Sequence, residues 1–327
     1  MRIDVAVIVG IYFLALLAWG LLNFIKNKNK TSTSEESQYI GKRSFGFGSL
    51  LATLVAAWAS NYTLLAASES GFTNGISGPI WYAIGVGVPI LFFVWPINIV
   101  KKIKEAMPQG VTIVEYIGQR YNEKSRFAAL IIVLTSNILY LISVVMATGI
   151  VLASLLNIDI QTATIIGGTV LVLYTALGGF EAMVWAHAYQ LVLAGLSIIV
   201  AIILTIYNVG LHEFPDSIAQ DNLNLFSWGP LQMVDFFLVL TALSIASPII
   251  WQRIFSAKDS KSASKAIWWF GPVWAPFAVG AGIMGMAAHI LMPEIDPSQS
   301  ATRFVMELFP NWAAILFLLG GMALGNR

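Results

Sequence analysis

Polar side chains interrupt an apolar segment, residues 46–72, that is long enough to cross a membrane. Its interior carries Ser60, Asn61, Thr63, Ser68 and Glu69. Unpaired polar groups are costly in hydrocarbon, so a helix that faces lipid has no use for these side chains. Small and polar residues at membrane depth serve either close helix packing or an opened backbone that coordinates a solute. The segment is therefore a candidate for one of these two roles.

A second apolar segment, residues 238–251, is interrupted in the same way by Ser244, Ser247 and Pro248. Pro248 has no backbone N–H, so it frees a carbonyl about one turn earlier in a helix. Paired interrupted helices, one in each half of a chain, are typical of transporters whose site lies near the membrane midplane. The two segments lie five spans apart, which predicts that each begins a five-helix repeat.

The composition is that of a membrane protein. The 327 residues are 57% hydrophobic and only 11% charged, whereas a soluble domain carries about 25% charged residues. A membrane helix needs roughly 20 apolar residues. The apolar runs predict nine spans, at about 5–25, 46–72, 80–100, 127–156, 161–180, 184–209, 229–250, 267–292 and 304–325.

Basic residues gather in three loops of this nine-span arrangement. Of the 18 Lys and Arg residues, five lie in 26–43, six in 101–126 and four in 253–265. With the N-terminus outside, all three clusters fall on one side of the membrane. Cytoplasmic loops carry an excess of Lys and Arg, so the pattern predicts a multi-pass protein of the cell membrane with these loops in the cytoplasm.

The spans also divide the chain into parts. They predict a leading transmembrane helix in 1–25, a cytoplasmic linker in 26–45, a first five-helix repeat in 46–209, an extracellular loop in 210–228, and a partial second repeat of three helices in 229–327. The linker contains the one low-complexity segment, which is rich in Lys, Asn, Ser and Thr.

Several motifs occur in a characteristic order along nearly the whole chain. They are the run 58–83, Thr112-x-x-Glu115, Arg120-Tyr121, Asn137-Ile-Leu, the run 174–185 with its Gly-Gly pair, and Trp251-Gln-Arg. Each motif alone is weak, but their order resembles the sodium:solute symporter family, and within it the urea/polyamine permease branch.

The resemblance implies an all-α polytopic membrane protein with the inverted-repeat (5+5) fold, here preceded by one extra helix. It also implies a sodium site between core helices one and eight, to which Ala56 and Ala59 would offer backbone carbonyls. The alternative is that these alanines only allow close helix packing. The family's hydroxyl residues on core helix eight should begin where the chain ends at Arg327, so we expect a C-terminally truncated second repeat.

His187 departs from the family pattern, which has an Asp beside the Trp that corresponds to Trp185. An imidazole can hold a proton near pH 7, whereas a carboxylate can hold Na⁺. Three interpretations remain open: proton coupling through His187, loss of an auxiliary ion site, or a histidine that is simply hydrogen-bonded near the cytoplasmic interface.

Four polar residues are expected near the midplane as substrate ligands: Thr63, Asn137, Ser244 and Ser247. No Lys or Arg is predicted among them, and these are the groups that would hold a carboxylate. The predicted solute is therefore neutral or cationic, and hydroxyl and amide groups suit a urea-like molecule.

The sequence thus predicts a secondary active transporter that couples Na⁺ to a small polar solute by alternating access. The alternatives are a membrane-embedded solute sensor of a signalling protein and a proton-coupled symporter. We expect no enzyme activity, no cofactor other than Na⁺ as the coupling ion, and no nucleic acid partner; the partners are the solute, Na⁺ and the lipid bilayer. If the second repeat is incomplete, the chain alone should show no ion-driven uptake.

Overall fold

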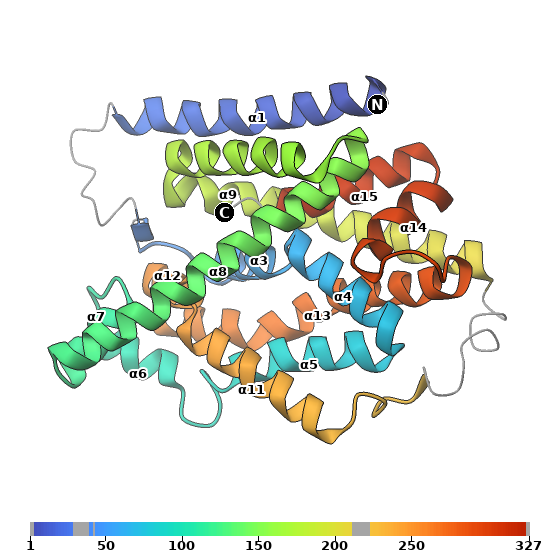
Figure 1. Cartoon of the computed structure of the whole chain (residues 1–327). Coiled ribbons are helices and arrows are strands. Elements are labelled where there is room, and N and C mark those ends of the chain that lie inside the picture. Colours follow the sequence, from blue (N-terminus) through green and yellow to red (C-terminus); the bar gives the residue numbers. More distant parts are fainter. Residues whose placement is uncertain (1–2, 29–38, 42, 211–222, 325–327) are drawn as a thin grey trace.

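The computed structural model describes residues 3–28, 39–41, 43–210 and 223–324, and this part of the chain is almost entirely helical (Figure 1). The helices are α1 (Ile3–Lys28), α3 (Phe47–Trp58), α4 (Asn61–Asn74), α5 (Ser77–Leu91), α6 (Ile99–Ala106), α7 (Ile113–Arg120), α8 (Glu123–Leu156), α9 (Ile160–Val209), α11 (Pro230–Ala246), α12 (Pro248–Ser256), α13 (Ser260–Leu291), the 3₁₀ turn η2 (Pro297–Gln299), α14 (Ser300–Leu308) and α15 (Asn311–Leu324).

The apolar helices follow the predicted spans in order. Within the described residues, five helical segments are long and apolar enough to cross a membrane: Val7–Ile25, Glu123–Leu156, Ile160–Leu177, Ala186–Val209 and Ser260–Leu291. Two bent pairs, α3 with α4 and α11 with α12, each have the length and composition of one broken span. The apolar helices α5 and α15 are shorter.

Two predicted boundaries were wrong. The run 80–100 contains the end of α5 at Leu91 and a turn before α6. The run 304–325 is split between α14 and α15 at Pro310, which has no N–H to continue a helix. The runs 161–180 and 184–209 share the helical element α9, in which Ile160–Leu177 and Ala186–Val209 are each long and apolar enough to cross a membrane. Parts of the predicted linker and of the predicted loop 210–228 lie outside the described residues.

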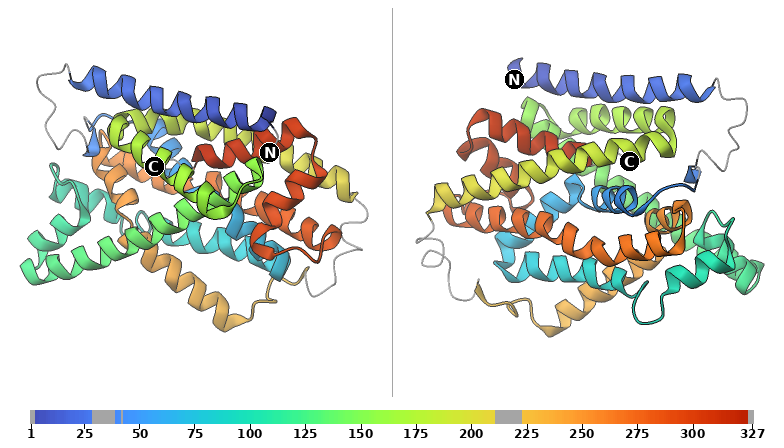
Figure 2. Two further views of the ribbon diagram at one scale, coloured as in Figure 1. Left: turned by 45° about the horizontal axis from the view of Figure 1, so that its top comes forward. Right: turned by 180° about the vertical axis from the view of Figure 1, so that it is seen from behind.

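Helix α1 packs on the outside of the helical body, along α9 (Figures 1 and 2). Leu16 of α1 meets Tyr174 and Ala186 in a small separate cluster, and Val9 of α1 belongs to the main core. The main core also holds the contacts of α13 with α3, α4 and α5. The leading helix is therefore peripheral to the helices that carry the predicted site.

Helices α4 and α13 approach each other through glycines. A Cβ atom on Gly285 would overlap the backbone of Ser68, and one on Gly71 would overlap the backbone of Gly282. Small residues let membrane helices come this close, so that backbone packs on backbone. This contact holds the C-terminal half, α4, of the first broken helix.

Two cations hold the C-terminal end of α12. Arg43 donates from Nη1 to the Phe255 carbonyl at 3.2 Å, and Lys104 donates from Nζ to the carbonyls of Ile254 and Phe255 at 3.1 and 3.2 Å. The final carbonyls of a helix lack helical partners and carry its negative dipole end, so cations stabilise them. The contacts tie the residues before α3 to the end of α12.

Lys104 should titrate at unusually low pH. Its burial, with the nearby Arg43 guanidinium as a second cause, lowers the pKa of its ammonium group from 10.5 to about 8. The unfolded state then binds more protons between these two values, so this group's contribution to stability rises with pH over that window. Competitive acylation should show half-reaction of Lys104 near pH 8, and Arg43→Gln should raise that midpoint. The exposed Lys102 is the internal control, and equal midpoints for both lysines would contradict this assignment.

Candidate functional site

The first broken helix opens at Ala59 and Ser60. Helix α3 ends at Trp58, α4 begins at Asn61, and the two axes are bent by 56°. Ala59 has a non-helical backbone and Ser60 an extended one, and both are fully buried. This confirms that the interrupted segment predicted from the sequence is an opened helix.

The opening leaves buried carbonyl groups without their helical donors. Ala59 N–H bonds the carbonyl of Val55 at 2.7 Å, and Leu64 N–H bonds that of Ser60 at 3.1 Å. Within the described residues, the carbonyls of Ala56 and Ala59 receive no hydrogen bond from Ser60 or Thr63, their usual partners in a helix. Buried carbonyls are normally paired, so these two are available to water or a cation.

The second broken helix is satisfied differently. Helices α11 and α12 are bent by 44° at Ser247. The carbonyl of Ser244, which would have bonded residue 248, accepts instead from Ser247 N–H at 3.4 Å. The Trp251 ring Nε1 donates to the carbonyl of Ile245 at 2.8 Å. The proline break is therefore confirmed, and protein groups bond these two freed carbonyls.

Of the four predicted substrate residues, the structure brings Asn137 and Ser247 together. Both line a small cavity of about 20 Å³, which is the space of a single water molecule. The hydroxyl of Thr63 instead bonds the Trp58 carbonyl at 2.5 Å, and that of Ser244 bonds Leu240 at 2.8 Å. In this conformation a solute therefore needs the cavity to widen.

The small cavity is linked to both neighbouring features. Tyr140 lines it and its hydroxyl lies 3.4 Å from Ser60 Oγ at the first break. Asn137 also lines a cleft of about 570 Å³ that runs between α7, α8 and α12 and includes Thr112, Arg126 and Gln252. The cleft opens toward the first half of α8, which carries basic residues.

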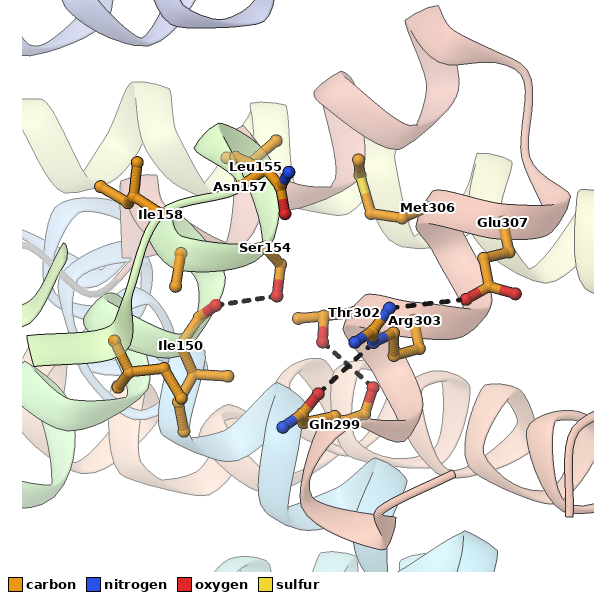
Figure 3. Close-up of a pocket in the computed structure, with 12 residues that line it drawn as sticks. Ile150, Ser154, Leu155, Asn157, Ile158, Gln299, Thr302, Arg303, Met306 and Glu307 are labelled. Atoms are coloured by element: carbon orange, nitrogen blue, oxygen red, sulfur yellow. Dashed lines mark hydrogen bonds and ion pairs between the residues drawn. The ribbon is translucent and has the colours of Figure 1, made fainter. Parts of the chain in front are cut away.

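A separate cleft of about 540 Å³ lies at the other end of α8, between that helix and α14 (Figure 3). Arg303 pairs there with Glu307 at 3.8 Å and contacts Gln299 Oε1 at 3.4 Å. None of the predicted site residues lines this cleft. The two clefts therefore lie at opposite ends of α8, with Asn137 next to only one of them.

His187 takes part in a buried hydrogen-bonded chain. Thr53 Oγ1 lies 3.0 Å from His187 Nδ1 and accepts from Arg253 Nη2 at 3.3 Å. Arginine can only donate, so the Thr53 oxygen accepts from Arg253, and its hydroxyl can still donate to His187 Nδ1 or accept from it, according to the histidine tautomer. These hydrogen bonds connect α3, α9 and α12.

Arg253 corrects one expectation from the sequence, which placed it in a cytoplasmic basic loop. The side chain is 2% exposed and lies within the helical body, because α12 continues past the proline break to Ser256. A guanidinium group in such a place is retained only with hydrogen-bond partners. The sequence signal for this position is Pro248, which can begin a helix and so predicts that Arg253, five residues later, lies within a helix and not in a loop.

Asn61 is a further polar group that the sequence analysis did not assign to the site. It is fully buried, its Nδ2 donates to Thr148 Oγ1 at 3.2 Å, and its Oδ1 has no partner among the described residues. A Cβ on Gly321 of α15 would lie 2.8 Å from that oxygen. An unpaired acceptor beside the break is a third oxygen that a ligand could use.

Comparison with known proteins agrees with these features. A model of the sodium:solute symporter family matches residues 38–323. The sodium-coupled monocarboxylate transporter 2 of Bos taurus is 26% identical over 320 residues, which is 89% of this chain and 49% of that protein. The urea-proton symporter DUR3 of Oryza sativa subsp. japonica is 26% identical over 171 residues, or 52% of this chain and 23% of that protein. The chain thus spans about half the length of the first of these relatives.

A solved structure of a Na⁺-coupled sialic acid symporter, in a substrate-bound outward-open state, matches all of this chain and 70% of its own. The TM-score is 0.80 at 19% identity. This likeness confirms the predicted all-α, inverted-repeat symporter fold. With its apolar helices, the chain is a multi-pass membrane protein. Because the family model matches residues 38–323, the chain belongs to the sodium:solute symporter family.

Proposed function

We propose that this protein is a secondary active transporter in which Na⁺ drives the uptake of a small polar solute. The observation that carries the proposal is the break between α3 and α4, where the buried carbonyls of Ala56 and Ala59 have no helical donors. Unwound carbonyls of discontinuous membrane helices are typical ligands of Na⁺. The Asn61 side-chain oxygen at the same break is an additional ligand for the ion or the solute.

Ion binding at this break would couple to transport through its effect on conformation. A ligand shifts an equilibrium between two states only by its difference in affinity for them. Na⁺ would favour the arrangement in which the opened backbone surrounds the ion and the neighbouring cavity admits the solute. The membrane potential then contributes about 2.3 kcal/mol per charge per 100 mV.

The proposed solute is neutral, and urea is the solute that the chemistry of the cavity favours. The small cavity offers Asn137, Ser247 and Tyr140 as polar groups and has no Lys or Arg among its described lining residues. Arg253 is nearby but bonds Thr53, so it is committed within the protein. The relatives named above act on different solutes, a monocarboxylate and urea, so the cavity chemistry is the argument for urea.

Counterflow of labelled urea tests both the ion and the solute, with the full-length protein in proteoliposomes. We expect accumulation with an inward Na⁺ gradient and none when choline replaces Na⁺. Unlabelled urea inside the vesicles should accelerate exchange, whereas a monocarboxylate such as lactate should not. Urea flux that is independent of Na⁺ would overturn the coupling, and exchange with lactate alone would overturn the solute.

A proton-coupled mechanism is the second candidate, because His187 lies in a buried chain of hydrogen bonds and one relative is named a urea-proton symporter. The positive charge of Arg253 at the other end of these hydrogen bonds opposes a second cation at His187. A doubly protonated His187 would place two cationic groups on the one Thr53 hydroxyl.

We expect His187→Gln to keep Na⁺-driven uptake within about twofold of wild type, because the glutamine amide can either accept from or donate to the Thr53 hydroxyl. The measurement is uptake at several pH values with Na⁺ held constant. His187→Leu, which has no acceptor, is the matched variant and should lower thermal stability. A His187→Gln protein that folds but loses a pH dependence present in the wild type would favour the proton-coupled mechanism.

A further inference from the structure

A basic cleft lies outside the site described above, where α6 and α13 both begin. It has a volume of about 490 Å³, and its polar lining comes from Asn98, Lys101, Ser260, Lys261, Ser264 and Lys265. We propose that this cleft binds the phosphate group of an anionic lipid. The group that binds is a phosphate, and it belongs to a lipid of the surrounding membrane.

The walls of the cleft are held together by a hydrogen bond between the two helices. Ser264 Oγ of α13 donates to Asn98 Oδ1 at 3.1 Å, and the same oxygen caps α6 by accepting from Lys101 N–H at 3.0 Å. Asn98 reaches this position with a left-handed backbone, φ 49°. Lys101 and Lys265 are thereby fixed on opposite walls of one cleft.

The cleft has a net positive charge. Lys101 lies in the first turn of α6, and Lys261 lies in the first turn of α13, where the helix dipole is already positive. Glu105 pairs with Lys101 at 4.0 Å, but both side chains are 58% exposed and such pairs contribute little. Asp259 caps α13 through Ser262 N–H and is the second carboxylate beside the three lysines. An anion would relieve the repulsion among the three lysines.

One lysine is held by an aromatic ring. Lys265 Nζ lies 4.5 Å from the centre of the Phe47 ring, at the start of α3. This contact is a cation–π interaction, which attracts the ammonium group to the ring face. The ammonium is thus positioned before any ligand arrives, which lowers the entropy cost of binding one.

The exposed tryptophans beside the cleft place it at the membrane interface, which makes a lipid the source of the phosphate. Trp268 lines the cleft one turn after Lys265 and is 48% exposed, and the adjacent Trp269 is similarly exposed. Tryptophan is enriched at the membrane interface, level with lipid headgroups. Val94 and Trp268 would contact the start of an acyl chain while the lysines contact the headgroup. Basic pockets between membrane helices bind anionic headgroups in this way.

The test measures lipid selectivity of the full-length protein in mixed phosphatidylcholine and phosphatidylglycerol vesicles. Spin-labelled versions of each lipid report the relative association with the protein. The variant Lys261→Gln/Lys265→Gln should lower the preference for phosphatidylglycerol about fivefold or more, since one lysine near a membrane surface changes affinity by about fivefold. Lys124→Gln, which removes an exposed lysine of α8 outside the cleft, should leave the preference within about twofold.

Two further measurements decide between specific and general charge effects. Lys261→Arg/Lys265→Arg should retain the selectivity, because guanidinium groups also bind phosphate. Inorganic phosphate at millimolar concentration should not displace spin-labelled phosphatidylglycerol. An unchanged preference in the double glutamine variant would overturn the proposal, as would an equal loss in Lys124→Gln. Full displacement by inorganic phosphate would overturn the lipid as the source.

Discussion

Gly285→Ala should destabilise the protein more than any other single methyl addition in α13. The added Cβ would overlap the carbonyl oxygen of Ser68 in α4, which is backbone and has no rotamer to change. Overpacking of a core costs about 1–3 kcal/mol, and more when backbone must move. Because α4 forms the C-terminal half of the first broken helix, the same change should also impair Na⁺-dependent uptake. Thermal unfolding in detergent should show a midpoint lower by about 5 °C or more.

Gly195→Ala in α9 is the matched control, because a Cβ at that position meets no atom within 4 Å. Replacing glycine by alanine in an open helical position is expected to stabilise by about 0.4–1 kcal/mol. A Gly285→Ala protein that unfolds at the wild-type temperature would show that α4 and α13 do not pack as closely as described here.

Asn61→Leu should separate ligand binding from stability. The change removes the hydrogen bond to Thr148, which stabilises the wild type by about 1 kcal/mol. It also removes the unpaired Asn61 oxygen, whose burial destabilises the wild type by about 1–3 kcal/mol. The two effects offset each other, so stability without ligand should stay within about 1 kcal/mol of wild type. If Asn61 Oδ1 contacts Na⁺ or the solute, the apparent Kd should rise at least about tenfold.

The readout for Asn61→Leu is the unfolding temperature of the full-length protein, titrated with NaCl in the presence and absence of urea. Choline chloride at equal ionic strength controls for salt. Asn208→Leu is the matched variant, since Asn208 is exposed on α9 and, among the residues that the structure describes, its amide bonds the Leu204 carbonyl alone. An Asn61→Leu protein whose stabilisation by Na⁺ and by urea equals that of wild type would exclude this oxygen from the site.

The two broken helices have different local structures, which suits different roles. At the first break the carbonyls of Ala56 and Ala59 lack helical donors, whereas at the second the Trp251 ring bonds the carbonyl of Ile245. The first break is therefore the one that we propose as the ion site. The second is braced further along α12 by Arg253, Arg43 and Lys104, so movement of α12 would have to break several hydrogen bonds to charged groups.

Much of the architecture was determined by the sequence alone. Runs of about 20 apolar residues specify membrane helices because a bilayer has one thickness and the helix one rise per residue. Pro248 and the small, polar residues around Ala59 marked both helix breaks for equally local reasons. The run 304–325 failed at Pro310 because hydropathy averages over a window and does not register one missing N–H.

The side-chain arrangement of the site was decided only by the tertiary structure. Thr53 meets His187 and Arg253 across 134 and 200 residues of chain, and no local pattern connects them. The sequence of its segment does not show that packing leaves the Asn61 oxygen buried without a donor beside the helix break. Hydrophobic burial depends on composition and period, which the sequence displays. Hydrogen-bond partners and unpaired buried groups depend on which distant helices meet, and only the folded chain sets that.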